Sequence, residues 1–221
     1  SIIKTIDIRL GCLSPYPIDL HQVHNPFHLS SVAKVMEAMA ALVESGKIKY
    51  IGVSNYSAEQ MRRADETLRN KGLRLVSNQV HYSLLRRRIE TNGVLEAAEE
   101  LGITIIAYSP LAQGILSGKF HDDPGRAKTL PGFRKFMPAF KPKALEQSRP
   151  VVEACREIGR RYGKTSAQVA LNWLVRFHKE SVVAIPGATK VSQAESNASA
   201  LTFDLTRQEM EHLDRLSSAY K

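Results

Sequence analysis

The stretch GKIKYIGVSNYSAEQMRRADETLRNKG, residues 46–72, decides the fold class because it contains one complete strand-and-helix unit. Ile48–Ser54 is a short run of β-branched and apolar residues without clean polar alternation, which is typical of a parallel strand buried on both faces. Ser57 and Gln60 form a capping box at the start of the segment that follows, and Gly72 is placed to end it. The stretch therefore predicts a β-strand followed by an α-helix.

The same strand pattern recurs four more times along the chain. The further predicted strands are Ile18–His24, Arg74–Val80, Ile103–Ser109 and Val182–Pro186. Segments with helical periodicity and caps lie between or after them, at residues 31–45, 57–72, 93–102, 144–162 and 165–178, and from residue 206 onward. The first four strands begin about every 30 residues, which is the size of a βα unit. This alternation predicts an α/β fold with a parallel sheet of about five βα units.

The interval between the fourth and fifth strands is longer than the others. It contains residues 121–142, which are rich in Pro, Gly, Phe and Lys, and then two helical segments. Segments of this length without regular structure are uncommon in compact domains unless they are functional or disordered. We interpret residues 121–142 as a long loop within a single domain that covers residues 1–221, and we expect this loop to shape a substrate pocket.

The composition is that of a globular protein, with 43% apolar and 24% charged residues. No apolar run approaches the roughly 20 residues of a membrane span, and no charged-then-apolar leader opens the chain. The two cysteines, Cys12 and Cys155, are too few for a disulfide framework, which fits a reducing compartment. These features predict a cytoplasmic protein without a membrane partner.

Basic residues outnumber acidic residues by 31 to 22, which gives the chain a formal charge of +9. Most surface charge is simply solvated, and the alternative is an anionic partner, either a phosphorylated cofactor or a nucleic acid. The basic residues are scattered, and neither zinc-finger spacing nor a motif of combined aromatic and basic residues is present. We therefore predict no nucleic-acid partner.

Polar side chains gather at the carboxyl ends of the predicted strands. They include His24, Ser54 with Asn55, Gln79, Tyr108 with Ser109, and Thr189 with Lys190. In a (β/α) barrel the loops at this end form the active site. The segment after Gly187 begins a helix, whose N-terminus attracts anions, and the small residues from Gly114 to Lys119 are suited to wrap phosphate oxygens. These turns are interpreted either as phosphate sites or as ordinary βα turns with a helix cap.

Five segments resemble the aldo-keto reductase family in their order and spacing. They are IDLHQVHNP (18–26), GKIKYIGVSNYS (46–57), NQVHYSLLRR (78–87), GITIIAYSPLAQGILSGK (102–119) and VVAIPGATKVSQAESNASAL (182–201). Together GVSNYS and AYSPLAQGILSGK are highly specific for this family. The resemblance implies a (β/α)8 barrel that binds NADPH and transfers hydride to a carbonyl.

The resemblance also implies roles for individual residues. His24 matches the family's catalytic histidine, which orients the substrate carbonyl; otherwise it is a buried, hydrogen-bonded histidine at a strand end. Tyr108 matches the aromatic residue that stacks on the nicotinamide ring. The remaining implied cofactor contacts are Ser54, Asn55 and Gln79 at the nicotinamide amide, Ser109, Leu111, Gln113, Gly114, Ser117 and Lys119 over the pyrophosphate, and Gly187, Thr189, Lys190, Gln193 and Asn197 at the adenosine end. Ser196 and the position of Lys190 depart from the family pattern, so the choice between NADP and NAD stays open.

The family's chemistry uses four residues, Asp, Tyr, Lys and His, and only the histidine has a match in these 221 residues. The chain opens on SIIKTIDIRLG, which resembles the helix after the family's third strand, so its five strands match the fourth to eighth. We therefore expect a partial TIM barrel, from a shortened member of the family that lacks strands one to three. Five strands do not close a barrel, and the open edges predict a homo-oligomer.

The function that the resemblance implies is NADP(H)-dependent reduction of aldehydes or ketones, weakened because the Asp, Tyr and Lys segments are absent. His24, Tyr82 or water would then supply the proton. Two alternatives stay open: a catalytically inactive NADP-binding or structural protein, and a fragment of a complete reductase. The expected partners are a small carbonyl substrate and further copies of the chain, and no metal site is expected.

Overall fold

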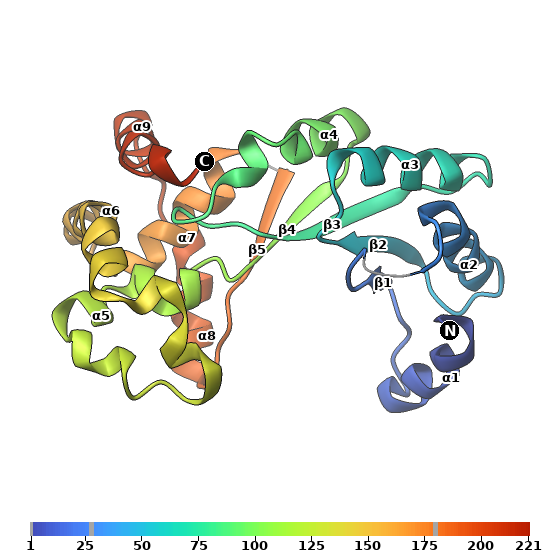
Figure 1. Cartoon of the computed structure of the whole chain (residues 1–221), viewed down its shortest axis with the longest axis horizontal. Helices are drawn as coiled ribbons and strands as arrows, with labels where there is room; N and C mark the ends of the chain where they lie inside the picture. Colours follow the sequence, from blue (N-terminus) through green and yellow to red (C-terminus); the bar gives the residue numbers. More distant parts are fainter. Residues whose placement is uncertain (1, 27–28, 179–180) are drawn as a thin grey trace. The chain divides into compact units, whose positions relative to one another are not determined.

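The computed structural model describes residues 2–26, 29–178 and 181–221, and its elements are drawn in Figure 1. The strands in these residues are β1 (Leu20–Val23), β2 (Tyr50–Ser54), β3 (Leu75–His81), β4 (Thr104–Tyr108) and β5 (Val182–Ile185). All five predicted strands are confirmed, each to within two residues at either end.

The helices alternate with the strands along the chain, as the sequence predicts. They are α1 (Ile2–Leu13), α2 (Val32–Glu44), α3 (Ala58–Arg69), α4 (Val94–Leu101), α5 (Lys119–Asp122), α6 (Pro142–Tyr162), α7 (Ser166–Phe177), α8 (Val191–Ala198) and α9 (Arg207–Leu216). Short 3-10 turns are η1 (Arg88–Glu90), η2 (Ala112–Ser117), η3 (Pro124–Ala127), η4 (Gly132–Phe136), η5 (Pro138–Phe140), η7 (Ser199–Leu201) and η8 (Ser218–Tyr220). The segment 121–142, predicted as a long loop, therefore contains the short helical turns η3, η4 and η5.

Side-chain caps set the start of several helices. The Ser57 Oγ atom accepts a hydrogen bond from the Gln60 backbone at 3.2 Å, and the Gln60 side chain accepts one from the Ser57 backbone at 3.0 Å. This is the predicted capping box, and it satisfies amides at the start of α3 that have no partner within the helix. The same motif begins α7 and α9, with Thr165 as the capping residue of α7.

The strands form one sheet in the order β1-β2-β3-β4-β5. β1 and β2 pair in parallel with Leu20 opposite Tyr50, and β2 and β3 also pair in parallel. A Cβ atom at Gly52, in β2, would overlap the side chain of Ser77 in β3, so the close approach of the strands requires glycine there. The α/β fold class with a parallel sheet is confirmed, and parallel pairing brings the carboxyl ends of β1, β2 and β3 to one edge.

Internal contacts divide the chain into two compact units. Unit one consists of residues 1–80 and 89–106, and unit two consists of residues 81–88 and 107–221. Unit one thus holds β1, β2 and helices α1 to α4, while unit two holds β5 and helices α5 to α9. The single domain that we expect over residues 1–221 stays a prediction.

A hydrophobic cluster in unit two supports the segment that follows β4. Its buried members are Ile115, Phe120, Ala127, Phe140 and Leu145. The rings of Phe120 and Phe140 meet edge to face, with their centroids 5.0 Å apart. Burying each phenylalanine contributes roughly 1.5–3 kcal/mol, so the cluster fixes η2 and α5 against η5 and α6.

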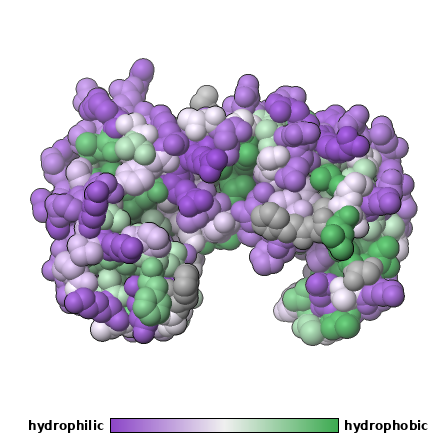
Figure 2. Space-filling model, viewed as in Figure 1, coloured by the Kyte–Doolittle hydropathy of each residue, from purple (hydrophilic) through white to green (hydrophobic). Residues whose placement is uncertain are grey.

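The visible surface is largely hydrophilic, with apolar residues in small patches (Figure 2). One patch lies on α1, where Ile3, Ile8 and Leu13 are about half exposed or more and Ile6 is the buried residue of the helix. Apolar side chains of β5 are also exposed, namely Val183 at 45% and Ile185 at 47%. The helix α1 precedes β1, and β5 is the last strand in the sheet order. Exposed apolar patches of this kind are available for packing against further protein.

Candidate cofactor and active site

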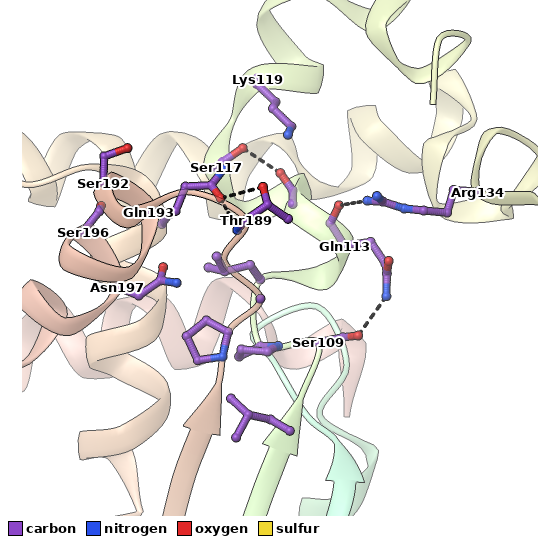
Figure 3. A pocket seen from close by; sticks show the side chains of 17 residues that line it. Ser109, Gln113, Ser117, Lys119, Arg134, Thr189, Ser192, Gln193, Ser196 and Asn197 are labelled. Atoms are coloured by element: carbon purple, nitrogen blue, oxygen red, sulfur yellow. Dashed lines mark hydrogen bonds between the residues drawn. The ribbon is translucent and has the colours of Figure 1, made fainter. Parts of the chain in front are cut away.

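The carboxyl ends of β4 and β5 border a cavity of about 820 Å³ that lies entirely within unit two (Figure 3). Its lining residues are Ser109, Pro110, Leu111, Gln113, Gly114, Ser117, Lys119, Arg134, Ala167, Ile185, Pro186, Gly187, Thr189, Ser192, Gln193, Ser196 and Asn197. This volume falls within the range of about 300–1,000 Å³ that is usual for ligand and cofactor sites. We call it the cofactor cavity.

The turn after β4 forms one wall of the cofactor cavity. Gln113 and Gly114 adopt left-handed backbone conformations, with φ angles of 59° and 92°. The Gln113 side chain donates to Ser109 Oγ at 2.8 Å, and Ser117 Oγ donates to the Gly114 carbonyl at 2.7 Å (Figure 3). A left-handed non-glycine residue costs on the order of 1–3 kcal/mol and persists only where neighbours hold it. These hydrogen bonds hold the turn in the one shape that faces the cavity.

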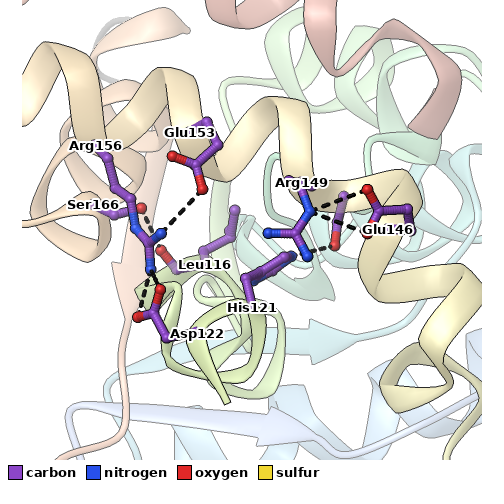
Figure 4. Close-up of polar contacts among 9 residues, drawn as sticks. Leu116, His121, Asp122, Glu146, Arg149, Glu153, Arg156 and Ser166 are labelled. Atoms are coloured by element: carbon purple, nitrogen blue, oxygen red, sulfur yellow. Dashed lines mark hydrogen bonds and ion pairs between the residues drawn. The ribbon is translucent and has the colours of Figure 1, made fainter. Parts of the chain in front are cut away.

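Gly118 also contributes to the shape of this turn. Its φ angle is 84°, and a Cβ atom there would overlap the guanidinium of Arg156. Arg156 is itself held by ion pairs with Asp122 at 2.7 Å and Glu153 at 3.0 Å (Figure 4). The left-handed backbone angle favours glycine here, and the position of Arg156 beside it adds to that preference just before α5 and Lys119.

The charge of the cofactor cavity is positive. Lys119 and Arg134 are among its lining residues, and none of the lining residues is Asp or Glu. The Arg134 Nη2 atom donates to the Gln113 carbonyl at 2.8 Å, while its Nε atom is buried without a partner in the described part of the chain. A buried donor without a partner is costly, so this atom is suited to an added acceptor such as a phosphate oxygen.

The segment between β5 and α8 forms the opposite wall. The Gln193 Oε1 atom accepts hydrogen bonds from the Thr189 backbone at 2.7 Å and from the Thr189 hydroxyl at 3.1 Å. The α8 helix begins directly afterwards, and Ser192, Ser196 and Asn197 line the cavity from it (Figure 3). The first turn of this helix carries free amides and a positive dipole end, which favour an anion.

Tyr108 ends β4 but is not a lining residue of the cofactor cavity. The His81 ring stacks on it with ring centroids 5.0 Å apart and an angle of 29° between the planes. Burial, with a further contribution from the charge of Arg86, lowers the pKa of His81 to about 4. His81 is therefore neutral at neutral pH and packs as a flat aromatic ring.

Ser54, Asn55 and Gln79 lie together in unit one. The Gln79 carbonyl accepts from Ser54 Oγ at 2.8 Å and from the Asn55 backbone at 2.9 Å, and the Asn55 amide donates to Ser54 Oγ at 3.1 Å. His24 follows β1 in the same unit and is exposed, which differs from the alternative of a buried strand-end histidine. These hydrogen bonds hold Ser54, Asn55 and Gln79 against one another at the carboxyl ends of β2 and β3.

Comparison with known proteins identifies the family. A family model described as the aldo/keto reductase family matches residues 1–218. This chain belongs to the aldo/keto reductase family. Probable pyridoxal reductase 2 of Schizosaccharomyces pombe is 33% identical to it over 202 residues, which are 90% of this chain and 59% of that protein. An uncharacterized oxidoreductase of Mycobacterium tuberculosis is 37% identical over 204 residues, which are 92% of this chain and 60% of that protein.

Solved structures agree with the family assignment. The crystal structure of a thermostable aldo-keto reductase, in complex with the inhibitor epalrestat, has a TM-score of 0.76 and 28% sequence identity to this chain. The match covers 97% of this chain and 65% of that one. The chain thus spans about 60% of the length of its curated relatives. In the described residues no helix is long and apolar enough to cross a membrane, and no cluster of metal-ligating side chains occurs.

The aldo/keto reductase resemblance located most of the cavity walls. The structure brings together ten residues singled out from the sequence: Ser109, Leu111, Gln113, Gly114, Ser117, Lys119, Gly187, Thr189, Gln193 and Asn197. Tyr108 and Lys190 do not line the cavity, and His24, Ser54, Asn55 and Gln79 belong to unit one. Ser196, noted from the sequence as a departure from the family pattern, also lines the cavity, and the lining residues not predicted as site residues are Pro110, Arg134, Ala167, Ile185, Pro186 and Ser192.

Tyr82, one of the three proton sources considered from the sequence, is fully buried. Its hydroxyl lies 2.7 Å from His178 Nε2, and the two rings pack with centroids 5.9 Å apart. A substrate carbonyl reaches this hydroxyl only if the surrounding core opens. The exposed His24 is therefore better placed than Tyr82 to meet a substrate.

Proposed function

We propose that this chain acts as an NADP(H)-dependent oxidoreductase that reduces aldehydes or ketones. The observation that supports the proposal is the cofactor cavity. Its walls contain the hydrogen-bonded turn after β4, the N-terminus of α8, and the basic residues Lys119 and Arg134, and none of the lining residues is Asp or Glu. Among the catalytic residues that the family resemblance implies, His24 is the one proposed to act within these 221 residues.

The residues of the cofactor cavity fit a dinucleotide phosphate. Lys119 and Arg134 supply two cationic groups, and the buried Arg134 Nε atom supplies a donor that has no acceptor among the described residues. The turn at Ser109–Ser117 and the start of α8 would hold the pyrophosphate and the adenosine phosphate respectively. The family resemblance also implies Lys190 at the adenosine end. Lys190 stands at the N-cap position of α8 but does not line the cavity, so it is a weaker candidate for phosphate binding than Lys119 or Arg134.

The chemistry proposed for the site divides between two groups of residues. When bound, NADPH supplies the hydride. From the family resemblance, Ser54, Asn55 and Gln79 would bind the nicotinamide amide, and the Tyr108 ring would stack on the nicotinamide. His24 would donate a hydrogen bond to the substrate carbonyl oxygen, which polarises the carbonyl, and it or a water molecule would supply the proton that balances the reduction.

The proposed substrate class is small aldehydes and ketones, and aromatic aldehydes are the first to assay. Two relatives are described as pyridoxal reductases, one from Schizosaccharomyces pombe and one, chloroplastic, from Arabidopsis thaliana. Pyridoxal is an aromatic aldehyde of a size that suits an enclosed pocket. We expect oxidation of NADPH at 340 nm when pyridoxal or an activated benzaldehyde is added, with the alcohol as product.

Replacing Lys119 with methionine is expected to weaken NADPH binding about 10-fold. The side chain length is kept and one charged contact to phosphate is lost, which corresponds to roughly 1.5 kcal/mol. Titration of NADPH fluorescence measures the dissociation constant directly. The control is Lys128→Met, which removes an exposed lysine outside the cavity lining. Equal affinities for the two variants and the wild type would remove Lys119 from the phosphate site.

A second candidate function is NADP binding without catalysis. It is favoured by the position of the candidate phosphate-binding groups, because ten of the residues implied for cofactor binding line the cofactor cavity and His24 does not. The two functions separate in one assay: NADPH fluorescence changes in both cases, whereas aldehyde-dependent oxidation of NADPH occurs only in the enzyme. Binding without turnover would establish the second function.

We also propose a cytoplasmic homo-oligomer. The proposal is supported by the end positions of β1 and β5 in the strand order, by their half-exposed apolar neighbours, and by two cysteines that are both free thiols. We expect a native mass of at least twice 24.6 kDa in light scattering of the whole chain. A charged substitution at an exposed β5 residue outside the cofactor cavity, Val183→Lys, is expected to lower that mass, and a monomer at all concentrations would contradict the proposal.

A further inference from the structure

A second cavity, of about 320 Å³, lies within unit two and shares a wall with the cofactor cavity. Gln113 lines both cavities, so the turn after β4 separates them. The other walls come from the residues after β3, from residues 137–139, from the first turns of α6 and from Tyr220 near the end of the chain. We call this the His81 cavity, after the ring that lines it from the end of β3.

The His81 cavity has an apolar lining and a cationic edge. Leu85, Ile115 and Met137 are among its apolar residues, and no Asp or Glu belongs to the lining. Arg86 lines it and is exposed. Since His81 is neutral at neutral pH, the guanidinium of Arg86 is the charge of the lining. Charge complementarity therefore favours a ligand with an apolar body and one anionic group.

A buried pair of polar side chains, Ser148 and His121, lies at the cavity wall. Ser148 lines the cavity, and its Oγ atom donates to the Leu145 carbonyl at 3.0 Å and lies 3.0 Å from His121 Nε2. Because the hydroxyl hydrogen is used at Leu145, His121 Nε2 is the donor in this contact. Ser148 Oγ keeps a lone pair, which can accept a hydrogen bond from a hydroxyl group on a ligand.

The position of His81 separates this cavity from the proposed chemistry. Its ring stacks on the ring of Tyr108, with the centroids 5.0 Å apart, so His81 lies between the cavity that it lines and Tyr108, which is not a lining residue. This inference rests on the proposed function: if Tyr108 stacks on the nicotinamide, a ligand in the His81 cavity is separated from the nicotinamide by the Tyr108 ring and does not receive the hydride. The cavity is therefore a separate site rather than the pocket of the carbonyl substrate.

We propose that the His81 cavity binds a small apolar carboxylate, such as an aromatic acid, at the same time as the cofactor. Arg86 pairs with the carboxylate, and the apolar lining packs against the ring. Such a ligand would pack against Ala112 and Gln113, whose φ angles of 48° and 59° are left-handed, and would hold the turn in the shape that lines the cofactor cavity. The two ligands are therefore compatible and do not compete.

The test uses 2-naphthoate as the probe and 2-naphthamide as its neutral isostere, with binding followed by calorimetry. Ala144→Trp places a large side chain in the cavity and is expected to weaken 2-naphthoate binding at least about 10-fold, since a filled cavity loses its packing contacts. The matched control is Lys143→Trp, because the neighbouring residue of the same helix is exposed and does not line the cavity. We expect the control to bind like the wild type.

Arg86→Gln tests the contribution of the Arg86 charge to binding. Because Arg86 is exposed, this substitution does not disturb the packing of the core. We expect it to weaken 2-naphthoate about 3-fold and to leave 2-naphthamide unchanged, a modest effect because the arginine is exposed. Saturating NADP is expected to leave 2-naphthoate affinity equal or higher. The proposal is overturned if 2-naphthoate does not bind, if both variants bind it like the wild type, or if NADP displaces it. Absence of NADP binding would contradict the proposed function, while the naphthoate measurements would still decide this site.

Discussion

Replacement of His24 by alanine is expected to lower kcat for NADPH-dependent aldehyde reduction by about 100-fold, the lower end of what a positioned acid contributes. His24 follows β1 and is exposed, and it does not line the cofactor cavity. The loss should therefore fall on the chemical step, and NADPH affinity should stay the same. Stopped-flow oxidation of NADPH with 4-nitrobenzaldehyde measures the step, and fluorescence titration measures the affinity.

Two further variants separate the chemistry of His24 from general effects. His24→Gln keeps a hydrogen-bond donor at the site and removes the titrating ring, so we expect it to retain more activity than the alanine variant if positioning of the carbonyl dominates. His212→Ala removes an exposed histidine from α9 and is expected to react like the wild type. Equal rates for His24→Ala and the wild type would exclude His24 from the mechanism.

Replacement of Arg87 by alanine is expected to lower the free energy of unfolding by about 2–4 kcal/mol, because a fully buried side chain is truncated and its charge-assisted hydrogen bonds are lost. Arg87 is 0% exposed and ion-pairs with Asp214. Its Nη1 atom also donates to the Asp214 carbonyl at 2.9 Å and to Ser217 Oγ at 2.7 Å. The guanidinium carbon lies 4.7 Å from the centre of the Trp173 ring.

The pH dependence of this effect has a definite sign. Partial burial alone would raise the pKa of the Asp214 carboxyl, but hydrogen bonds and charges from Arg87 and Lys221 lower it overall. A carboxyl with a lowered pKa contributes stability above its ordinary pKa of 3.8, and this contribution is lost as the pH falls through the folded-state value. The stability difference between the wild type and Arg87→Ala should therefore be full near pH 7 and shrink below about pH 4.

Urea unfolding followed by tryptophan fluorescence measures this effect, because Trp173 is the single tryptophan and packs on Arg87. The control is Arg88→Ala, since Arg88 is the adjacent residue and is exposed. We expect the control to change stability by less than about 1 kcal/mol. A shift in the unfolding midpoint no larger for Arg87→Ala than for Arg88→Ala would contradict the structural role of the buried arginine.

The strand-and-helix order could be predicted from the sequence because its signals are local. Ile48–Ser54 and the Ser57–Gln60 capping box specify β2 and the start of α3 within a dozen residues. The walls of the cofactor cavity were also accessible, since in a parallel sheet the chain after each strand emerges at one edge. Ser109–Lys119 and Gly187–Asn197 follow the neighbouring strands β4 and β5, and most of their predicted residues line one cavity.

The residues that the sequence did not reveal depend on long-range packing. Arg134 lies 21 positions from Gln113 in a segment without regular periodicity, and only the hydrophobic cluster around Phe120 and Phe140 brings it to the cavity. Arg87 stood within a basic run, where solvated charge is the usual case, yet it is buried against Trp173. The low pKa of His81 likewise follows from burial, which no local pattern encodes.

Amide hydrogen exchange with and without NADP tests most directly the proposal that the ends of β4 and β5 enclose the phosphate-binding part of an NADP site. Ligand binding lowers the rate of local opening where the ligand is held. We expect slower exchange in two separate peptides, residues 109–119 and 187–197, and in residues around Arg134, with unchanged exchange in α1 and α2 of unit one. Unchanged exchange at both peptides with saturating NADP, or protection confined to other segments, would contradict the account.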